Sequence, residues 1–297
     1  MQIHTRPTFN APADAGWWFM TKAAVQGWLT DRASSMGAAL AYYTFFSMAP
    51  LLLIVISVAG LVLGREAAQG HLMSELSGML GQQAATSIQA LIASVSEPAD
   101  NRWGTLLGIG VMLVGATTVF AELQDALDRI WEAPLRPAGG GLWALLRARV
   151  LSFGLILGLG FLLMVSLVMG ALIAGLGRWL SHSLGNWVWV AKSLNLGIGF
   201  VITAAIFALI YKMMPRARVQ WNDVWVGAVV TALLFSLGKA LIGLYLSASG
   251  VASAYGAAGS LVLVLVWVYY SAQIFLLGAE FTWVYANARG SRRALAR

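Results

Sequence analysis

Long apolar runs constrain the fold of this chain more than any other feature of its sequence. Only 10% of the residues are charged and 59% are hydrophobic, whereas a soluble domain carries about 25% charged residues. The alternating pattern of a transmembrane β-barrel is absent. We therefore expect an all-α, polytopic membrane protein with six transmembrane helices, each close to or longer than the roughly 20 residues that cross a bilayer. The six apolar runs lie near residues 36–63, 103–121, 149–176, 190–211, 223–247 and 257–285.

The distribution of basic residues predicts the orientation of these helices. If the N-terminus is cytoplasmic, 14 of the 19 Lys and Arg residues fall on the cytoplasmic side, and Lys239 lies within a span. Cytoplasmic loops carry an excess of Lys and Arg, so both termini are predicted to be cytoplasmic. The net charge of +7 follows from this topology and from contact with anionic membrane lipids, and it does not indicate nucleic-acid binding. The four basic residues on the outer side are Arg65, Arg102, Arg178 and Lys192.

The non-spanning segments divide the chain into three parts. Residues 1–35 form a cytoplasmic tail and, because Trp17, Trp18 and Trp28 recur at helical spacing, an amphipathic helix in the membrane interface. This N-terminal region lacks the pattern of a cleavable signal peptide. Residues 36–287 form the transmembrane domain, and residues 288–297 form a basic cytoplasmic tail.

Two connecting segments within the transmembrane domain have their own helical periodicity. Apolar residues in 65–102 form two stripes at i, i+3, i+4 spacing, separated by a glycine turn at 81, which predicts an amphipathic helical hairpin on the outer side. This hairpin either covers a cavity that opens outward or serves only packing. Residues 122–148 are cytoplasmic, and their helical part carries Glu122 together with the i, i+4 pair Asp125 and Arg129.

The residues that catalysis requires do not form a recognisable constellation. The three histidines have no carboxylate at metal-ligand spacing, cysteine is absent, and neither a phosphate-binding glycine loop nor a G-x-S-x-G turn occurs. We therefore expect a protein that is not an enzyme and that holds no metal or cofactor. Its expected partners are membrane lipids and a lipid or anion substrate.

Polar side chains inside the spans are the better functional candidates, because charges in a membrane are costly. Lys239 and Glu280 are the two charged ones; counting residues from the cytoplasmic edge separates them by about 16 Å, so a direct ion pair is not expected. Lys239 either faces an interior anion or extends toward the outer headgroups. Glu280 either serves function or bonds to groups such as Lys212 or Arg129. The further candidates for a cavity or transport path are Tyr42, Tyr43, Thr44, Ser47, Pro50, Tyr255, Tyr269, Tyr270 and Gln273.

Depth distinguishes two members of this set. Gln273 lies about 18 Å from the predicted cytoplasmic edge, near mid-membrane. Pro50 interrupts the first span near its middle, where its ring removes the backbone bond to the carbonyl of Phe46. Thr44 and Ser47 are placed to satisfy exposed carbonyls. Pro50 is either a static kink or a hinge that opens a cavity.

Four stretches of the chain resemble the YihY/BrkB family of bacterial inner-membrane proteins. The resemblance covers residues 25 to 286 and implies six spanning helices with cytoplasmic termini. It also identifies Pro50, Lys239, Tyr255, Gln273 and Glu280 as positions of the family pattern. The stretches are RASSMGAALAYYTFFSMAPLLL (32–53), TTVFAELQDALDRIW (117–131), YKMMPRARVQWNDVWVGAVVTALLFSLGKALIGLYL (211–246) and YGAAGSLVLVLVWVYYSAQIFLLGAEFTWVY (255–285).

The resemblance implies a role in the bacterial envelope. Members have been associated with resistance to serum killing and with export of lipid A precursors, and some carried a ribonuclease label that the residues here do not support. We therefore expect an inner-membrane protein that translocates an envelope-related lipid, amphiphile or anion. The alternative is a non-transporting scaffold for envelope assembly, and a ribonuclease that uses Asp125 and Asp128 is a distant third.

Overall fold

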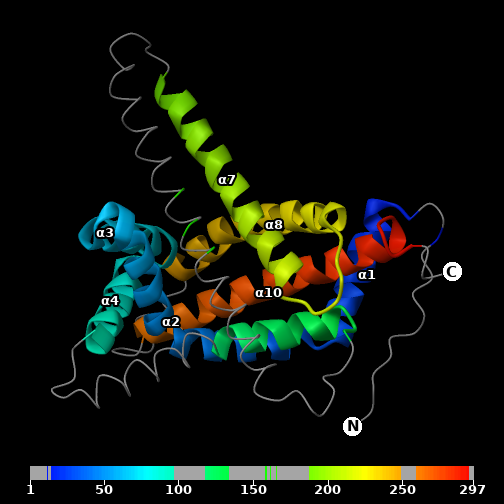
Figure 1. The fold of residues 1–297 in the computed structure, drawn as a ribbon, viewed down its shortest axis with the longest axis horizontal. Helices are drawn as coiled ribbons and strands as arrows, with labels where there is room; N and C mark the ends of the chain where they lie inside the picture. The colour runs from blue at the N-terminus through cyan, green and yellow to red at the C-terminus, as the bar shows by residue number, and fades with distance from the viewer. Residues whose placement is uncertain are drawn as a thin grey trace.

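Every regular element in the described part of the chain is an α-helix. The computed structural model describes residues 12, 15–96, 118–133, 158, 161, 165, 187–248 and 259–293. The helices are α1 (Trp17–Thr30), α2 (Ala33–Leu63), α3 (Arg65–Leu80), α4 (Gln82–Ser96), α7 (Trp187–Met213), α8 (Trp221–Ala248) and α10 (Gly259–Ala288), and residues 118–130 are also helical (Figure 1). The all-α prediction is confirmed for these residues.

Four of the helices are long and apolar enough to cross a membrane: α2, α7, α8 and α10. They contain 31, 27, 28 and 30 residues, so each extends about 40 Å or more and exceeds the hydrocarbon core. They coincide with four of the six predicted spans. The other two, 103–121 and 149–176, lie almost entirely outside the described residues, so the count of six and the cytoplasmic placement of the termini stay predictions.

Helix α10 is the centre of the described bundle. It packs against α8, α2 and α1, while α7 packs mainly against α8. In Figure 1, α2 and α10 run side by side, α7 leans away from them, and α1 lies at the opposite end of the bundle from α3 and α4. A polar side chain on α10 is therefore in reach of several other helices.

Helices α8 and α10 are antiparallel and approach closely through paired Gly and Thr residues. A Cβ added at Gly278 would meet the hydroxyl of Thr231, and one added at Gly227 would meet that of Thr282. Each threonine hydroxyl also donates to a carbonyl four residues earlier in its own helix, Gly227 O and Gly278 O respectively, at 2.7 Å. Both helices thus carry the same Gly-x-x-x-Thr pattern. Its contacts place Gly278 level with Thr231, and Gly227 level with Thr282, along the bundle.

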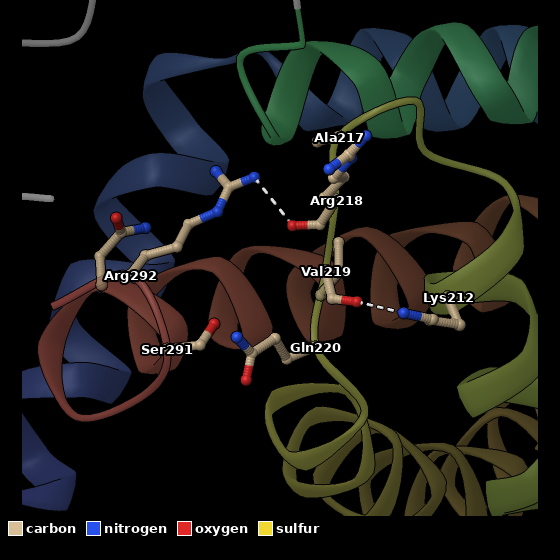
Figure 2. A pocket seen from close by; sticks show the side chains of 8 residues that line it. Lys212, Ala217, Arg218, Val219, Gln220, Ser291 and Arg292 are labelled. Carbon is tan, nitrogen blue, oxygen red and sulfur yellow. Dashed lines mark hydrogen bonds between the residues drawn. The ribbon is translucent and has the colours of Figure 1, made fainter. Parts of the chain in front are cut away.

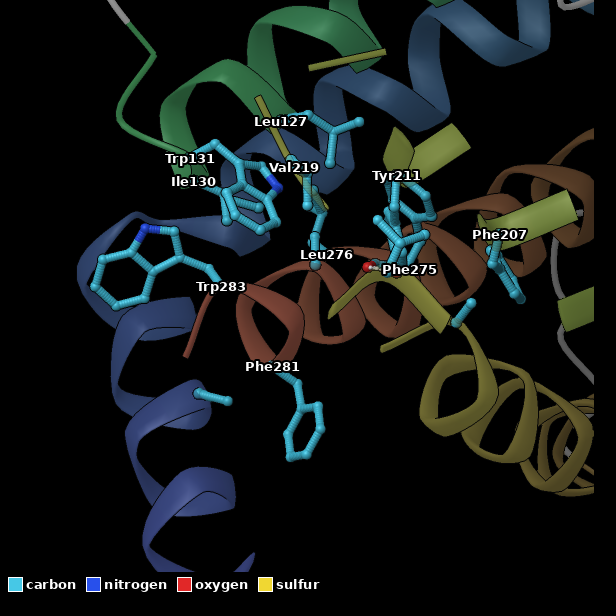
Figure 3. Packing of buried hydrophobic residues seen from close by; sticks show 14 of the residues in the cluster. Leu127, Ile130, Trp131, Phe207, Tyr211, Val219, Phe275, Leu276, Phe281 and Trp283 are labelled. Atoms are coloured by element: carbon cyan, nitrogen blue, oxygen red, sulfur yellow. Dashed lines mark hydrogen bonds between the residues drawn. The ribbon is translucent and has the colours of Figure 1, made fainter. Parts of the chain in front are cut away.

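Two apolar clusters stabilise the two ends of the bundle. The larger one joins the end of α7, the start of α8, the end of α10, α1 and residues 118–131. Figure 3 shows Leu127, Ile130 and Trp131 packed beside Val219 and Leu276. The smaller cluster joins the second half of α2 to the α3–α4 hairpin and to α10 through residues such as Leu53, Leu72 and Ile88.

The predicted helical hairpin is present as α3 and α4. Gly64 precedes α3 and Gly81 separates α3 from α4. Both have φ of +84°, a left-handed conformation that glycine adopts without strain. The predicted stripe residues Leu72, Ile88 and Ile92 are buried. In addition, the Ser87 hydroxyl donates to Ser260 on α10 at 2.9 Å, so the hairpin is attached to the central helix.

The predicted amphipathic helix is present as α1. Its buried residues, Met20 and Ala24, face the bundle. The predicted stripe is divided: Trp18 is exposed by 82% and Leu29 by 63%, whereas Trp28 packs against the larger apolar cluster. Trp17 is partly exposed and stacks on Phe281 of α10 with ring centroids 6.2 Å apart. An outward apolar face on a helix anchored to the bundle is what an interfacial position requires.

Candidate functional site

The predicted polar set does not gather in one place among the described residues. Ser47, Pro50 and Glu280 are buried, Tyr42 and Tyr269 are exposed by 58% and 38%, and Tyr43 and Thr44 are intermediate. Tyr255 lies outside the described residues. Pro50 is inside a continuous α2, from Ala33 to Leu63, and whether it is a kink or a hinge stays open to experiment.

Gln273 occupies the contact between α10 and α2. A Cβ added at Gly37 would collide with the Gln273 amide, so the absence of a side chain at Gly37 makes room for it. Both amide atoms, Nε2 and Oε1, are buried and have no hydrogen-bond partner among the described residues. A buried polar group without a partner costs about 1–3 kcal/mol of stability and requires an explanation.

The contact with Gly37 also fixes the level of Gln273. Gly37 lies one turn after the start of α2, so the Gln273 side chain lies level with the first turns of α2, although Gln273 is in the middle of α10. The reason is that α10 continues beyond the start of α2, where α1 packs against its last turns. This contact places Gln273 relative to α2, and its depth in the membrane stays a prediction.

Lys239 and Glu280 lie at different levels, as expected. Gly238 contacts Ile274 and Tyr270 of α10, whereas Gly227 contacts Thr282. Glu280 is therefore level with the third turn of α8, about ten residues or 15 Å from Lys239 along the helix. The Lys239 ammonium lies 5.6 Å from the Phe235 ring, and that ring meets Trp267 edge-on. The structure thus places the Lys239 ammonium beside the ring of Phe235.

A buried hydroxyl network joins α7, α8 and α10. Tyr211 donates to the carbonyl of Phe275 at 2.7 Å, and its hydroxyl lies 3.1 Å from that of Thr231. Both side chains are fully buried. Sequence reasoning missed this network, since a tyrosine and a threonine in apolar runs are not distinguishable from other polar residues before the helices are paired.

A basic pocket of about 740 Å³ lies where α7 ends, α8 begins and α10 ends. The basic-residue count predicts that this end of the bundle is cytoplasmic. Its lining residues are Lys212, Ala217, Arg218, Val219, Gln220, Asn287, Ser291 and Arg292. None of the predicted cavity residues lines it.

Two cations of the basic pocket hold the α7–α8 connection from either side. Lys212 Nζ donates to the carbonyl of Val219 at 2.5 Å, and Arg292 Nη2 donates to the carbonyl of Arg218 at 3.4 Å (Figure 2). The Arg292 guanidinium also lies 5.0 Å from the Trp131 ring. Burial lowers the pKa of Arg292, while the charges of Glu132 and Asp223 raise it; an arginine nevertheless stays charged at physiological pH.

Asp223 anchors the turn that follows α10. Its carboxylate accepts hydrogen bonds from the Ser291 hydroxyl at 2.5 Å and from the Ser291 amide at 3.3 Å. Asp223 is buried and sits in the first turn of α8, where a negative charge is favourable. Asp223 thus holds Ser291 in the pocket wall, and its charge acts on the neighbouring Arg292.

The predicted acidic helix joins the same end of the bundle through a different residue. Asp125 and Arg129 are exposed. The carboxylate of Asp128 instead pairs with Arg216, accepting from its backbone amide at 2.7 Å and lying 3.4 Å from its Nε. Gln124 donates to the carbonyl of Met214 at 3.0 Å. Burial, and secondarily the charge of Asp125, raise the pKa of Glu122.

Comparison with known proteins adds to this geometry. A sequence model of the family described as "Virulence factor BrkB" matches residues 24–297. The chain belongs to the BrkB family. No solved structure matches it significantly.

Curated relatives of this BrkB-family protein are named only as membrane proteins. The chain is 28% identical over 267 residues to a "UPF0761 membrane protein" of Pseudomonas aeruginosa (strain LESB58), which covers 89% of this chain and 62% of the relative. A protein of the same name from Psychromonas ingrahamii is 27% identical over 258 residues, covering 82% of this chain and 79% of the relative. The chain thus spans about three fifths of the length of the first of these relatives.

Proposed function

We propose that this BrkB-family protein translocates an envelope-related lipid, amphiphile or anion across the bacterial inner membrane. The observation that carries this proposal is the Gln273 amide, which is buried in the central helix with no partner among the described residues. Polar groups inside a membrane are costly, and those that persist commonly face a cavity or substrate path. A leucine of similar size would fill the same space at no polar cost, so stability alone does not favour glutamine at this position.

The contact of Gln273 with Gly37 points to α2 as the moving element. The first half of α2 carries Gly37 against α10, and its second half packs against the α3–α4 hairpin. Pro50 lies between the halves and removes one backbone hydrogen bond, which lowers the cost of bending there. Bending at Pro50 would separate Gly37 from Gln273 and expose the amide to a polar ligand.

Reconstitution with a Gln273→Leu variant tests the proposal. The full chain is inserted into liposomes, and movement of labelled phospholipid between leaflets and uptake of labelled anions are measured. We expect Gln273→Leu to lower the translocation rate while raising the melting temperature, because the variant removes an unpaired buried amide. The matched control is Gln26→Leu on the exposed side of α1, which should leave translocation unchanged.

Wild-type translocation by Gln273→Leu would refute the role of this residue. Repeated absence of any lipid or anion movement by the unmodified chain, with a stable partner protein that co-purifies, would instead favour a scaffold for envelope assembly. The ribonuclease alternative gains no support from Asp128, since Arg216 already pairs with its carboxylate.

A further inference from the structure

The basic pocket at the end of α10 contains cationic donors in excess of what the fold uses. Lys212 and Arg292 each donate one hydrogen bond to a backbone carbonyl, although a lysine has three N–H donors and an arginine has five. Arg218 is exposed, and its guanidinium has no hydrogen-bond or ion-pair partner among the described residues. Three cations therefore converge on one cavity from the end of α7, the α7–α8 connection and the turn after α10.

The neighbouring acids are directed at other cations. The charges of Asp223 and Glu132 act on Arg292, and the carboxylate of Asp128 is paired with Arg216. Among the described residues, no carboxylate forms an ion pair with Lys212 or Arg218. A net positive field consequently remains over Lys212 and Arg218, and an anion entering the pocket would find charge-assisted donors already in place.

An exposed apolar stripe leads away from the basic pocket along α8. It begins at Trp221, whose ring lies 5.6 Å from Lys212 Nζ. The exposed residues then recur every four positions, so successive side chains are neighbours and the stripe winds slowly around the helix, by about 40° per step. They are Trp221, Trp225, Val229, Leu233, Leu237 and Leu241.

The dimensions of pocket and stripe match one ligand class. A cavity of about 740 Å³ has the size of a small-molecule site. From Trp221 to Leu233 the stripe extends about 18 Å, close to the depth of one bilayer leaflet. Tryptophan at the start of the stripe suits the headgroup level. Basic pockets between helix ends on the cytoplasmic side are also the places where anionic headgroups bind.

We propose that the basic pocket binds the phosphate-bearing headgroup of an anionic phospholipid, with the acyl chains along the exposed face of α8. The Arg218 guanidinium and the Lys212 ammonium contact the phosphate, and the Gln220 amide contacts the polar headgroup. This proposal concerns binding and does not depend on translocation, so a protein that binds lipid without moving it would satisfy this proposal and fail the preceding one.

Native mass spectrometry of the purified full chain tests lipid retention. The protein in detergent is titrated with phosphatidylglycerol, with zwitterionic phosphatidylethanolamine, and with inorganic phosphate as a soluble competitor. We expect selective retention of phosphatidylglycerol and about tenfold weaker retention by Arg218→Gln, as loss of one charge-assisted contact predicts. Arg218→Lys should keep most of the binding, because the charge is preserved. Circular dichroism and size-exclusion chromatography verify that each variant is folded.

Arg289→Gln is the matched control, since Arg289 is an exposed cation at the same end of the bundle but does not line the pocket. Equal effects of Arg218→Gln and Arg289→Gln would overturn the proposal, because they would reveal general charge attraction. Equal retention of the anionic and zwitterionic lipids would overturn it as well. Binding of inorganic phosphate with no lipid retained would assign the pocket to a soluble anion and would likewise refute a lipid site.

Discussion

A methyl group at Gly278 is predicted to force α8 and α10 apart. The added Cβ would lie 2.8 Å from Thr231 Cβ and 2.6 Å from the Tyr211 hydroxyl, besides overlapping the Thr231 hydroxyl. Carbon atoms in contact are normally about 3.5–4.0 Å apart, so α8 must move by roughly 1 Å. Rotation of the side chains offers no escape, because Thr231 is bonded to Gly227 O and Tyr211 to Phe275 O.

The net effect of Gly278→Ala is a loss of about 1–3 kcal/mol in the free energy of unfolding. Overpacking costs about 1–3 kcal/mol, and weakening of the hydrogen bond from Tyr211 to the Phe275 carbonyl adds about 1 kcal/mol. The higher helix propensity of alanine offsets up to about 1 kcal/mol of this loss. Thermal unfolding in detergent, followed by the loss of helical circular dichroism, measures the difference from the unmodified chain.

Two further variants make the test specific. Gly199→Ala changes an exposed glycine of α7 around which no atom lies within 4 Å of the added Cβ, and it should be neutral or slightly stabilising. Combining Gly278→Ala with Thr231→Ala should recover part of the loss, since the second change removes the Thr231 hydroxyl, the nearest of the clashing atoms. If Gly278→Ala unfolds at the unmodified temperature, the close approach of α8 and α10 is refuted.

Three other substitutions test separate parts of the molecule. Lys239→Ala should abolish translocation and Lys239→Arg should keep part of it if the ammonium faces an anion; normal rates in both variants, measured in liposomes, would remove Lys239 from the transport path. Pro50→Ala should slow translocation if bending of α2 opens the path, whereas a rate equal to that of the unmodified chain would identify a static kink. Asp223→Ala should leave the Ser291 donors unpaired and loosen the turn after α10. Trypsin should then cleave several times faster after Arg289, Arg292 and Arg293. Asp125→Ala, on an exposed helix face, should not change the rate of cleavage.

Single-helix properties could be predicted from the sequence, and pairings between helices could not. Apolar length was sufficient for α2, α7, α8 and α10, because the bilayer sets a minimum length for each helix independently. Periodicity and a glycine were sufficient for the α3–α4 hairpin. By contrast, the contact of Gly278 with Thr231 becomes recognisable only when α8 and α10 are packed together.

The basic pocket escaped prediction for a related reason. Its cations come from positions 212, 218 and 292, and each was already explained by the excess of Lys and Arg expected on the cytoplasmic side. Only the packing of the end of α10 beside the α7–α8 connection brings them together. In the acidic helix, helical spacing selected Asp125 and Arg129, whereas the tertiary contact with Arg216 selected Asp128.

The reciprocal Gly–Thr contacts restrict how this protein can change shape. Sliding α8 along α10 by one turn would bring Thr231 opposite Ile274 or Thr282, where no glycine leaves space for it. We therefore expect the two helices to move together rather than to slide past one another. Lys239 and Gln273, carried on these two helices, would then keep their relative height along the bundle, and a rearrangement would take place at the contacts with α2 and α7.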